Sequence, residues 1–153
     1  MTIKVSIDLD REFTVNADID AVFALLSDVE GSAGYFPKVE SLEDLGDNTF
    51  RWTMEKVGLG DHAIQSIYAC NYVSDESAGT VKWTPIKGEG NGVVSGGWKF
   101  SAVDGGTQVK FDTTADLTLP LPGLLKLAIS PVVKHEFASM VDTYMERIQE
   151  ALS

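Results

Sequence analysis

The segment 3–15 alternates apolar and polar residues, and this pattern constrains the fold more than any other feature of the chain. Its apolar side chains fall on odd-numbered positions, and they are Ile3, Val5, Ile7, Leu9, Phe13 and Val15. A period of two places successive side chains on opposite faces of a strand. The segment therefore predicts one long strand that is buried on one face.

A second alternating segment lies near the other end of the chain. Its apolar face contains Val109, Phe111, Thr113, Ala115 and Leu117, and its opposite face Lys110, Asp112, Thr114 and Asp116. Most of the chain between 39 and 119 has the character of strands and turns. The turns are expected at 46–48, 58–61, 75–79, 88–92 and 104–106. This pattern is typical of an antiparallel sheet with one face in water.

Helical spacing appears in two places. After the first strand, Asn16 or Asp18 can cap a helix with a clear apolar face, and residues 28–36 predict a second short helical turn that ends at Pro37. The C-terminal segment is predicted to be helical from about Leu124 to Leu152. Pro131 is expected to kink this helix or to divide it. The apolar positions of the long helix are Val133, Phe137, Met140, Val141, Tyr144, Ile148 and Leu152.

The order of these elements predicts the architecture. It is one strand, two short helices, six strands and one long helix, within a single domain spanning residues 1–153. We expect an α+β fold in which a curved, seven-stranded antiparallel sheet wraps around the C-terminal helix, with the two short helices between strands one and two. A helix and a curved sheet do not fill the space between them along their whole length. An apolar cavity beneath the helix is therefore expected.

Several short motifs resemble the START-like superfamily, also called SRPBCC or helix-grip. They are Phe13-Thr14-Val15-Asn16-Ala17, Val22-Phe23-Ala24-Leu25-Leu26-Ser27-Asp28, Phe36-Pro37, Trp98-Lys99-Phe100 and Gly105-Gly106-Thr107-Gln108-Val109-Lys110-Phe111. The similarity covers essentially the whole chain. It is greatest to the polyketide cyclase/dehydrase and lipid-transport group, and it extends to the maturation proteins of carbon monoxide dehydrogenase. The resemblance implies the helix-grip fold, which hosts lipid carriers, cyclases and other functions.

Charge and composition exclude several classes of partner. The net charge is −11 and the pI is near 4.4, which disfavours nucleic acids and anionic membrane surfaces. No run approaches the roughly 18 apolar residues of a membrane span, and the first residues lack the pattern of a secretory signal. With Cys70 as the single cysteine, no intrachain disulfide can form. We expect a cytoplasmic protein.

No residue pattern indicates catalysis or a metal. His62 is expected at an exposed strand edge, and His135 on the solvent side of the long helix. Cys70 is expected to be a small buried apolar residue. The run 88–97 is rich in glycine but lacks a phosphate-binding ending, and it is typical of bulges in a bent strand, with some opening of a cavity. We assign no catalytic residue, no metal and no cofactor.

Aromatic and methionine side chains provide the candidate ligand-binding wall. They come from consecutive strands, from the short helices and from the long helix. They are Phe36, Trp52, Met54, Tyr68, Tyr72, Trp83, Trp98, Phe100, Phe111, Phe137 and Met140. The apolar loop 119–125 is expected at the mouth, with Phe36-Pro37 facing it across the opening.

The leading hypothesis is the binding or transport of a hydrophobic small molecule, a lipid or a polyketide-like compound, without catalysis. A cyclase or dehydratase is the alternative, and it requires a titratable group inside, for which His62, Glu55 and Asp116 are the candidates. The alternation places Arg51, Glu55 and Asp116 toward solvent. A further alternative is a partner-binding adaptor that resembles the maturation proteins of carbon monoxide dehydrogenase. A homodimer or a protein partner stays open.

Overall fold

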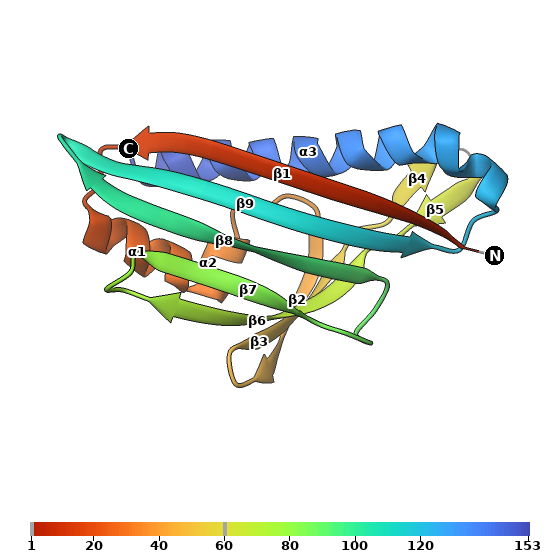
Figure 1. Ribbon diagram of the computed structural model, residues 1–153, viewed down its shortest axis with the longest axis horizontal. Helices are drawn as coiled ribbons and strands as arrows, with labels where there is room; N and C mark the ends of the chain where they lie inside the picture. The colour runs from red at the N-terminus through yellow and green to blue at the C-terminus, as the bar shows by residue number, and fades with distance from the viewer. Residues whose placement is uncertain (1, 60) are drawn as a thin grey trace.

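The computed structural model describes residues 2–59 and 61–153, and its main layer is a seven-stranded antiparallel sheet (Figure 1). The order of strands across the sheet is β1-β9-β8-β7-β6-β3-β2. Their bounds are β1 Ile3–Val15, β2 Val39–Gly46, β3 Thr49–Met54, β6 Ile67–Asp75, β7 Thr80–Ile86, β8 Gly92–Val103 and β9 Gly106–Leu119. This architecture confirms the predicted α+β helix-grip fold.

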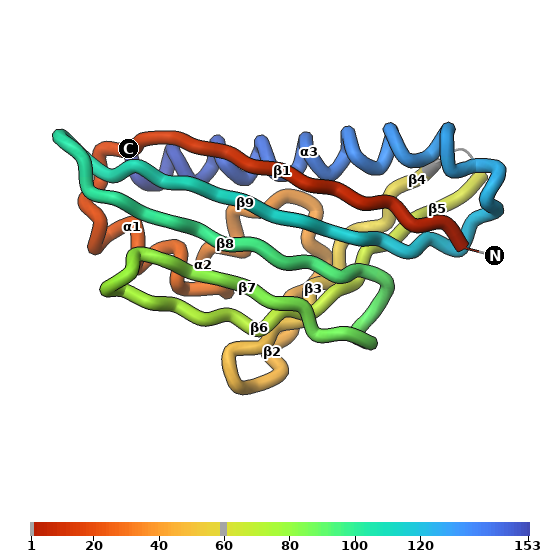
Figure 2. The backbone as a smooth tube through the Cα atoms, viewed as in Figure 1, coloured from red at the N-terminus to blue at the C-terminus, as the bar shows by residue number. Residues whose placement is uncertain are grey.

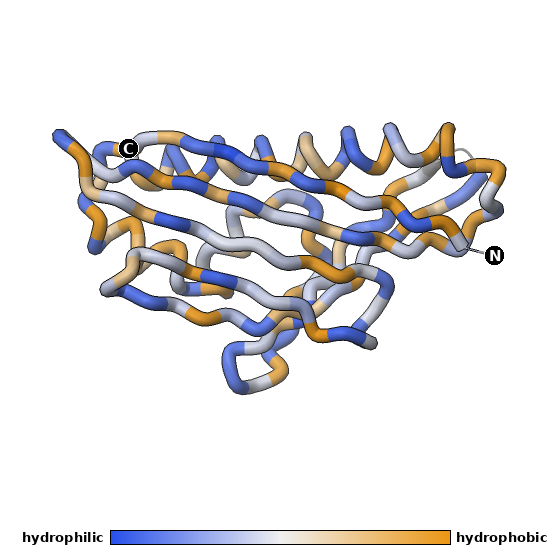
Figure 3. Tube along the Cα trace, viewed as in Figure 1, coloured by the Kyte–Doolittle hydropathy of each residue, from blue (hydrophilic) through white to orange (hydrophobic). Residues whose placement is uncertain are grey.

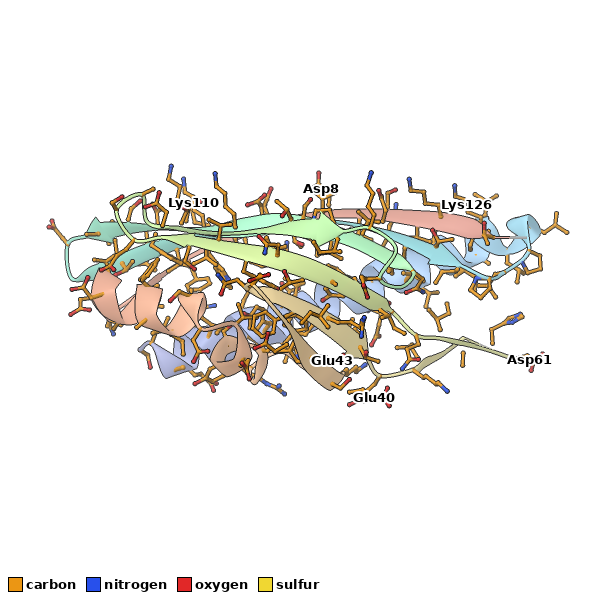
Figure 4. The ribbon with its side chains drawn as sticks, turned by 90° about the horizontal axis from the view of Figure 1, so that it is seen from below. Asp8, Glu40, Glu43, Asp61, Lys110 and Lys126 are labelled. Carbon is orange, nitrogen blue, oxygen red and sulfur yellow. The ribbon has the colours of Figure 1, made fainter. Side chains whose placement is uncertain are left out.

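The two alternating segments recognised in the sequence pair with each other. β1 and β9 are antiparallel over their whole length, from Ile3 opposite Leu119 to Val15 opposite Thr107. Their apolar positions face the core, while Asp8 and Lys110 project from the other face (Figures 3 and 4). Burying one face of two long strands supplies much of the apolar area that stabilises the domain.

All the helices lie on the concave face of the sheet (Figures 1 and 4). α1 (Ile19–Ser27) is capped by Asp18, whose carboxylate accepts from the Ala21 amide, and α2 (Val29–Ala33) is capped by Asp28. A short 3₁₀ turn, η1 (Gly123–Leu125), leads into α3 (Lys126–Ala151). The end of α3 is tied to the end of β1, because the Ala17 amide donates to the Leu152 carbonyl (Figure 2).

The long helix corrects one expectation. Pro131 lies inside α3, and the helix continues through it as one element rather than as two. Pro131 lies in the second turn of α3, so its missing N–H removes a hydrogen bond only near the start of the helix, and twenty residues of regular helix follow it. The predicted apolar face is confirmed, with Val133, Val141, Tyr144 and Ile148 buried.

A small second sheet was not expected from the sequence. β4 (Val57–Leu59) pairs with β5 (His62–Ile64), and together they extend the β3–β6 end of the molecule. The turn predicted at 58–61 includes Gly60, which lies outside the described residues. The interruption between β5 and β6 explains why the alternation over 62–73 is irregular.

Candidate functional site

Two neighbouring cavities lie between α3 and the sheet. The inner cavity has a volume of about 60 Å³ and the outer cavity about 40 Å³. Phe137, a half-buried residue of α3, lines both of them. Its side chain therefore forms part of the partition between the two spaces.

Aromatic side chains dominate the wall of the inner cavity. All three tryptophans of the chain line it, together with Tyr68 and Tyr72 from β6. The full lining is Leu26, Val29, Ser32, Phe36, Trp52, Tyr68, Cys70, Tyr72, Val81, Trp83, Val94, Trp98, Phe111, Thr113, Phe137, Val141 and Tyr144. No Lys, Arg, His, Asp or Glu is among these lining residues, so the inner wall is uncharged at neutral pH.

The rings hold one another in place. Trp52 stacks on Tyr68 with a centroid separation of 6.0 Å, and Trp98 contacts Phe111 at 4.8 Å. Phe36 packs between Trp52 and Tyr144, at 5.9 and 4.9 Å. Such pairs stabilise the wall beyond the area they bury.

The polar groups of the inner wall are neutral and largely paired with one another. Trp52 Nε1 donates to the Tyr72 hydroxyl at 2.9 Å, and the Tyr144 hydroxyl donates to Ser32 Oγ at 3.2 Å. The Cys70 thiol donates to the Val94 carbonyl at 3.2 Å. Burial raises the pKa of Cys70 to about 12 and that of Tyr144 to about 12, and it raises the pKa values of Tyr68 and Tyr72 as well.

A glycine shapes the sheet side of this cavity. Gly96 pairs with Trp83, and a Cβ at Gly96 would lie 2.1 Å from the Asp112 carbonyl oxygen. β8 therefore approaches β9 at this point in a way that only glycine allows. The Trp83 ring lies 3.0 Å from the position of that Cβ. The sequence expectation that this glycine run opens the cavity is corrected at Gly96, because the indole of Trp83 occupies the space.

The outer cavity has a different lining. Met54, Val57 and Ile64 come from the β3–β5 region, and Val133 and Met140 come from α3. Two carboxylates border it, Glu55 and Glu136, and Glu136 pairs with Lys38. The complete lining is Met54, Glu55, Val57, Ile64, Ser66, Leu117, Val132, Val133, Glu136, Phe137 and Met140.

The structure distributes the sequence candidates between these spaces. Eight of them line the inner cavity, namely Phe36, Trp52, Tyr68, Tyr72, Trp83, Trp98, Phe111 and Phe137. Met54 and Met140 line the outer cavity. Phe100 lines neither, because it packs edge-on against Phe23 of α1 at 6.2 Å.

The expected mouth is corrected. Phe36 contacts Tyr144, whereas the loop 119–125 precedes the other end of α3, about 28 Å away along the helix axis. The two segments therefore do not face each other across one opening. Within the loop Leu121 is buried, and the exposed leucines are Leu124 and the neighbouring Leu127 on α3.

The titratable candidates lie apart from the inner cavity. His62 and His135 are exposed. Asp116 is on the outer face of the sheet, where it accepts from Ser6 Oγ at 2.7 Å, and Arg51 is held by Glu43 and Glu89. Glu55 is exposed, as expected, but borders the outer cavity. No group of three or more metal-binding side chains occurs in the described part of the chain.

Sequence reasoning missed several lining residues. Val141 and Tyr144 follow Phe137 at spacings of four and three, and this helical period was a usable signal for both. Ser32 and Thr113 carried no such signal, because nothing in the sequence showed that their hydroxyls face the cavity.

Solved structures share this architecture. A protein from Thermus thermophilus is 23% identical with a TM-score of 0.62, covering 95% of this chain and 99% of its own. An aromatase/cyclase from a Streptomyces species is 18% identical with a TM-score of 0.59, covering 96% and 91%. A START superfamily protein from Mycobacterium smegmatis is 14% identical with a TM-score of 0.65, covering 95% and 96%. These similarities show the fold.

Comparison of sequences gives the family. No curated protein matches the chain. No helix in the described ranges has the length and apolar character that a membrane span requires. The family described as polyketide cyclase/dehydrase and lipid transport matches over residues 6–152, nearly the whole chain. The chain belongs to this family, whose fold binds ligands.

Proposed function

We propose that the protein binds an apolar small molecule in the inner cavity without transforming it chemically. The observation that carries the proposal is the composition of the inner wall. It is aromatic, its lining residues are uncharged, and its thiol and hydroxyl groups are held in their protonated forms by burial. A ligand in this space gains from burial of apolar surface and meets no nucleophile paired with a base.

Binding requires the cavity to open. A volume of about 60 Å³ holds water molecules but is smaller than the roughly 150 Å³ that admits benzene in a protein interior. Phe137 is half-buried and lies between the two cavities. A change of its rotamer joins the inner and outer spaces and gives the ligand a path that passes Met140.

The test uses Prodan, a neutral naphthalene ketone whose emission shifts to the blue in apolar surroundings. Saturable binding with a blue shift is expected for the wild-type protein. Cys70→Leu adds apolar volume at the sheet side of the inner cavity and should abolish binding. Val73→Leu lies on the same strand but is exposed, so it is the matched control and should bind normally. Absence of saturable binding, or equal binding by Cys70→Leu, would contradict the proposal.

A second candidate function is a cyclase or dehydratase, and the two carboxylates of the outer cavity favour it. Glu55 and Glu136 border the path to the inner cavity and supply proton acceptors there. The test is turnover of a linear poly-β-ketone thioester by the wild-type protein and by Glu55→Gln. Cyclised product from the wild-type protein, and its loss in the variant, would favour the enzyme. Unchanged substrate in both would exclude it.

The adaptor hypothesis stays a prediction. The exposed apolar side chains it would use are Leu124 and Leu127, at 95% and 91% exposure. Light scattering of the purified protein, alone and with a candidate partner, measures whether either residue mediates assembly.

A further inference from the structure

We infer that the ligand is an uncharged molecule with a hydrogen-bond acceptor oxygen, such as a ketone or quinone carbonyl, which accepts from the hydroxyl of Tyr68, and that carboxylates are excluded from the inner cavity. This inference rests on the proposed function, because it takes the inner cavity as the ligand site. It adds the chemical class of the molecule that the cavity selects.

The Tyr68 hydroxyl is available to a ligand. Tyr68 is 8% exposed, lines the inner cavity, and makes no hydrogen bond to any described residue. Its oxygen is nevertheless not enclosed by protein, since the only fully enclosed side-chain polar atom without a partner in the described ranges is Ser130 Oγ. The hydroxyl therefore borders the open space of the cavity. A buried donor without an acceptor is costly, and a ligand oxygen relieves that cost.

The rest of the wall reinforces this preference for an acceptor. The Tyr72 oxygen accepts from Trp52 Nε1, which leaves the Tyr72 proton without an acceptor among the described residues. The thiol of Cys70 and the hydroxyl of Thr113 already donate to backbone carbonyls, at 3.2 Å each. Donors thus outnumber the acceptors available to them in the inner cavity. A ligand that brings only donors would leave Tyr68 unsatisfied.

Charge distinguishes a ketone from a carboxylate. No cationic side chain lines the inner cavity, and Lys38, the cation near the outer cavity, is paired with Glu136. A carboxylate moved into this wall would lose its hydration without gaining a counter-charge. It would also pass two carboxylates, Glu55 and Glu136, on a protein whose net charge is −11. A neutral carbonyl meets none of these costs.

The experiment compares three naphthalenes of similar size. 2-Acetylnaphthalene carries an acceptor oxygen, 2-ethylnaphthalene has no oxygen, and 2-naphthoate carries a negative charge at pH 7.5. Affinities are measured by quenching of the tryptophans, all three of which line the cavity. The acetyl compound is expected to bind about threefold to tenfold tighter than the ethyl compound. The naphthoate is expected to bind at least about a hundredfold more weakly than the acetyl compound.

Tyr68→Phe removes the donor and keeps the ring that stacks on Trp52. The variant should bind the acetyl and ethyl compounds with equal affinity, while Tyr35→Phe, outside both cavities, should keep the wild-type ratio. Equal affinities in the wild-type protein, a ratio that survives in Tyr68→Phe, or tight binding of naphthoate would overturn the inference and leave the proposed function standing. Binding of none of the three compounds would overturn both.

Discussion

The inner and outer cavities share Phe137 but differ in charge and in packing. The inner wall is aromatic and uncharged, and its hydroxyl and thiol groups are protonated. The outer wall is aliphatic and is bordered by Glu55 and Glu136. The comparison separates two tasks. Recognition depends on the rings and donors of the inner cavity, whereas admission depends on the side chains that surround the outer one.

The largest expected effect is a loss of stability at alkaline pH that originates in the inner cavity. The pKa of Tyr144 is raised from 10 to about 12 and that of Cys70 from 9 to about 12, and the pKa of Tyr68 is also raised. Above the unfolded-state pKa values the native state binds more protons than the unfolded state, so the free energy of unfolding falls as pH rises. Stability should be full below about pH 9 and decrease between about pH 9 and 12, by about 1 kcal/mol per pH unit for each group.

Urea unfolding between pH 7.5 and 11 measures this loss. The described lining of the outer cavity contains no tyrosine or cysteine, so the decrease reports on the inner cavity. Tyr144→Phe should make the slope shallower by one group. Ionisation of Tyr68 and Tyr144 near pH 10 in a protein that stays folded would contradict the assignment.

The second prediction compares one truncation in each cavity. Trp98 is 4% exposed and contacts both Phe111 and Tyr144, so Trp98→Ala should lower the free energy of unfolding by about 3–5 kcal/mol. Met140 is half-buried on the outer wall, and Met140→Ala should cost about 1 kcal/mol. Both values come from urea unfolding at pH 7.5. Equal costs would show that the two walls are packed equally tightly.

These two walls also differ in how far the sequence predicts them. Strict alternation fixed the faces of β1 and β9, because one residue of slip would expose every apolar side chain of a strand. The same alternation predicted that Trp52 and Trp83 face inward, and helical spacing placed Phe137 beside them. The fold and most of the aromatic wall were therefore accessible from local periodicity.

Features that depend on distant contacts were not accessible. β4 and β5 have three residues each, too few for a period to emerge. The position of Phe36 depends on where α2 meets α3, so its contact with Tyr144 rather than with loop 119–125 needed the structure. The filling of the space at Gly96 by Trp83 depends on the register between β7 and β8. Periodicity carries no register between strands.

The third prediction removes the partition between the cavities. Phe137→Ala joins the inner and outer spaces, so Prodan should enter about tenfold faster than in the wild-type protein, with a blue shift at least as large. Stopped-flow fluorescence measures the rate. Leu124→Ala removes an apolar side chain from the start of the same helical region but from neither cavity, and should leave the rate unchanged. An unchanged rate in Phe137→Ala would show that the ligand takes another path.

The smallest expected effect concerns the charge of the outer cavity. Glu55 is exposed, so its field is screened by solvent, and Glu55→Gln should strengthen the binding of 2-naphthoate by only about twofold, and less at high salt. Glu76→Gln makes the same change of net charge on the exposed turn between β6 and β7 and should have no effect. Titrations of tryptophan fluorescence at 20 and 500 mM NaCl compare the variants.

The size of this effect decides where a carboxylate is rejected. A twofold change leaves naphthoate far weaker than 2-acetylnaphthalene, which places the rejection in the inner cavity, where a charge loses its hydration and finds no cation among the lining residues. Recovery of naphthoate binding to the level of the ketone in Glu55→Gln would place it at the outer cavity instead. The two cavities would then exchange roles, with selection by charge at the entrance and only apolar packing within.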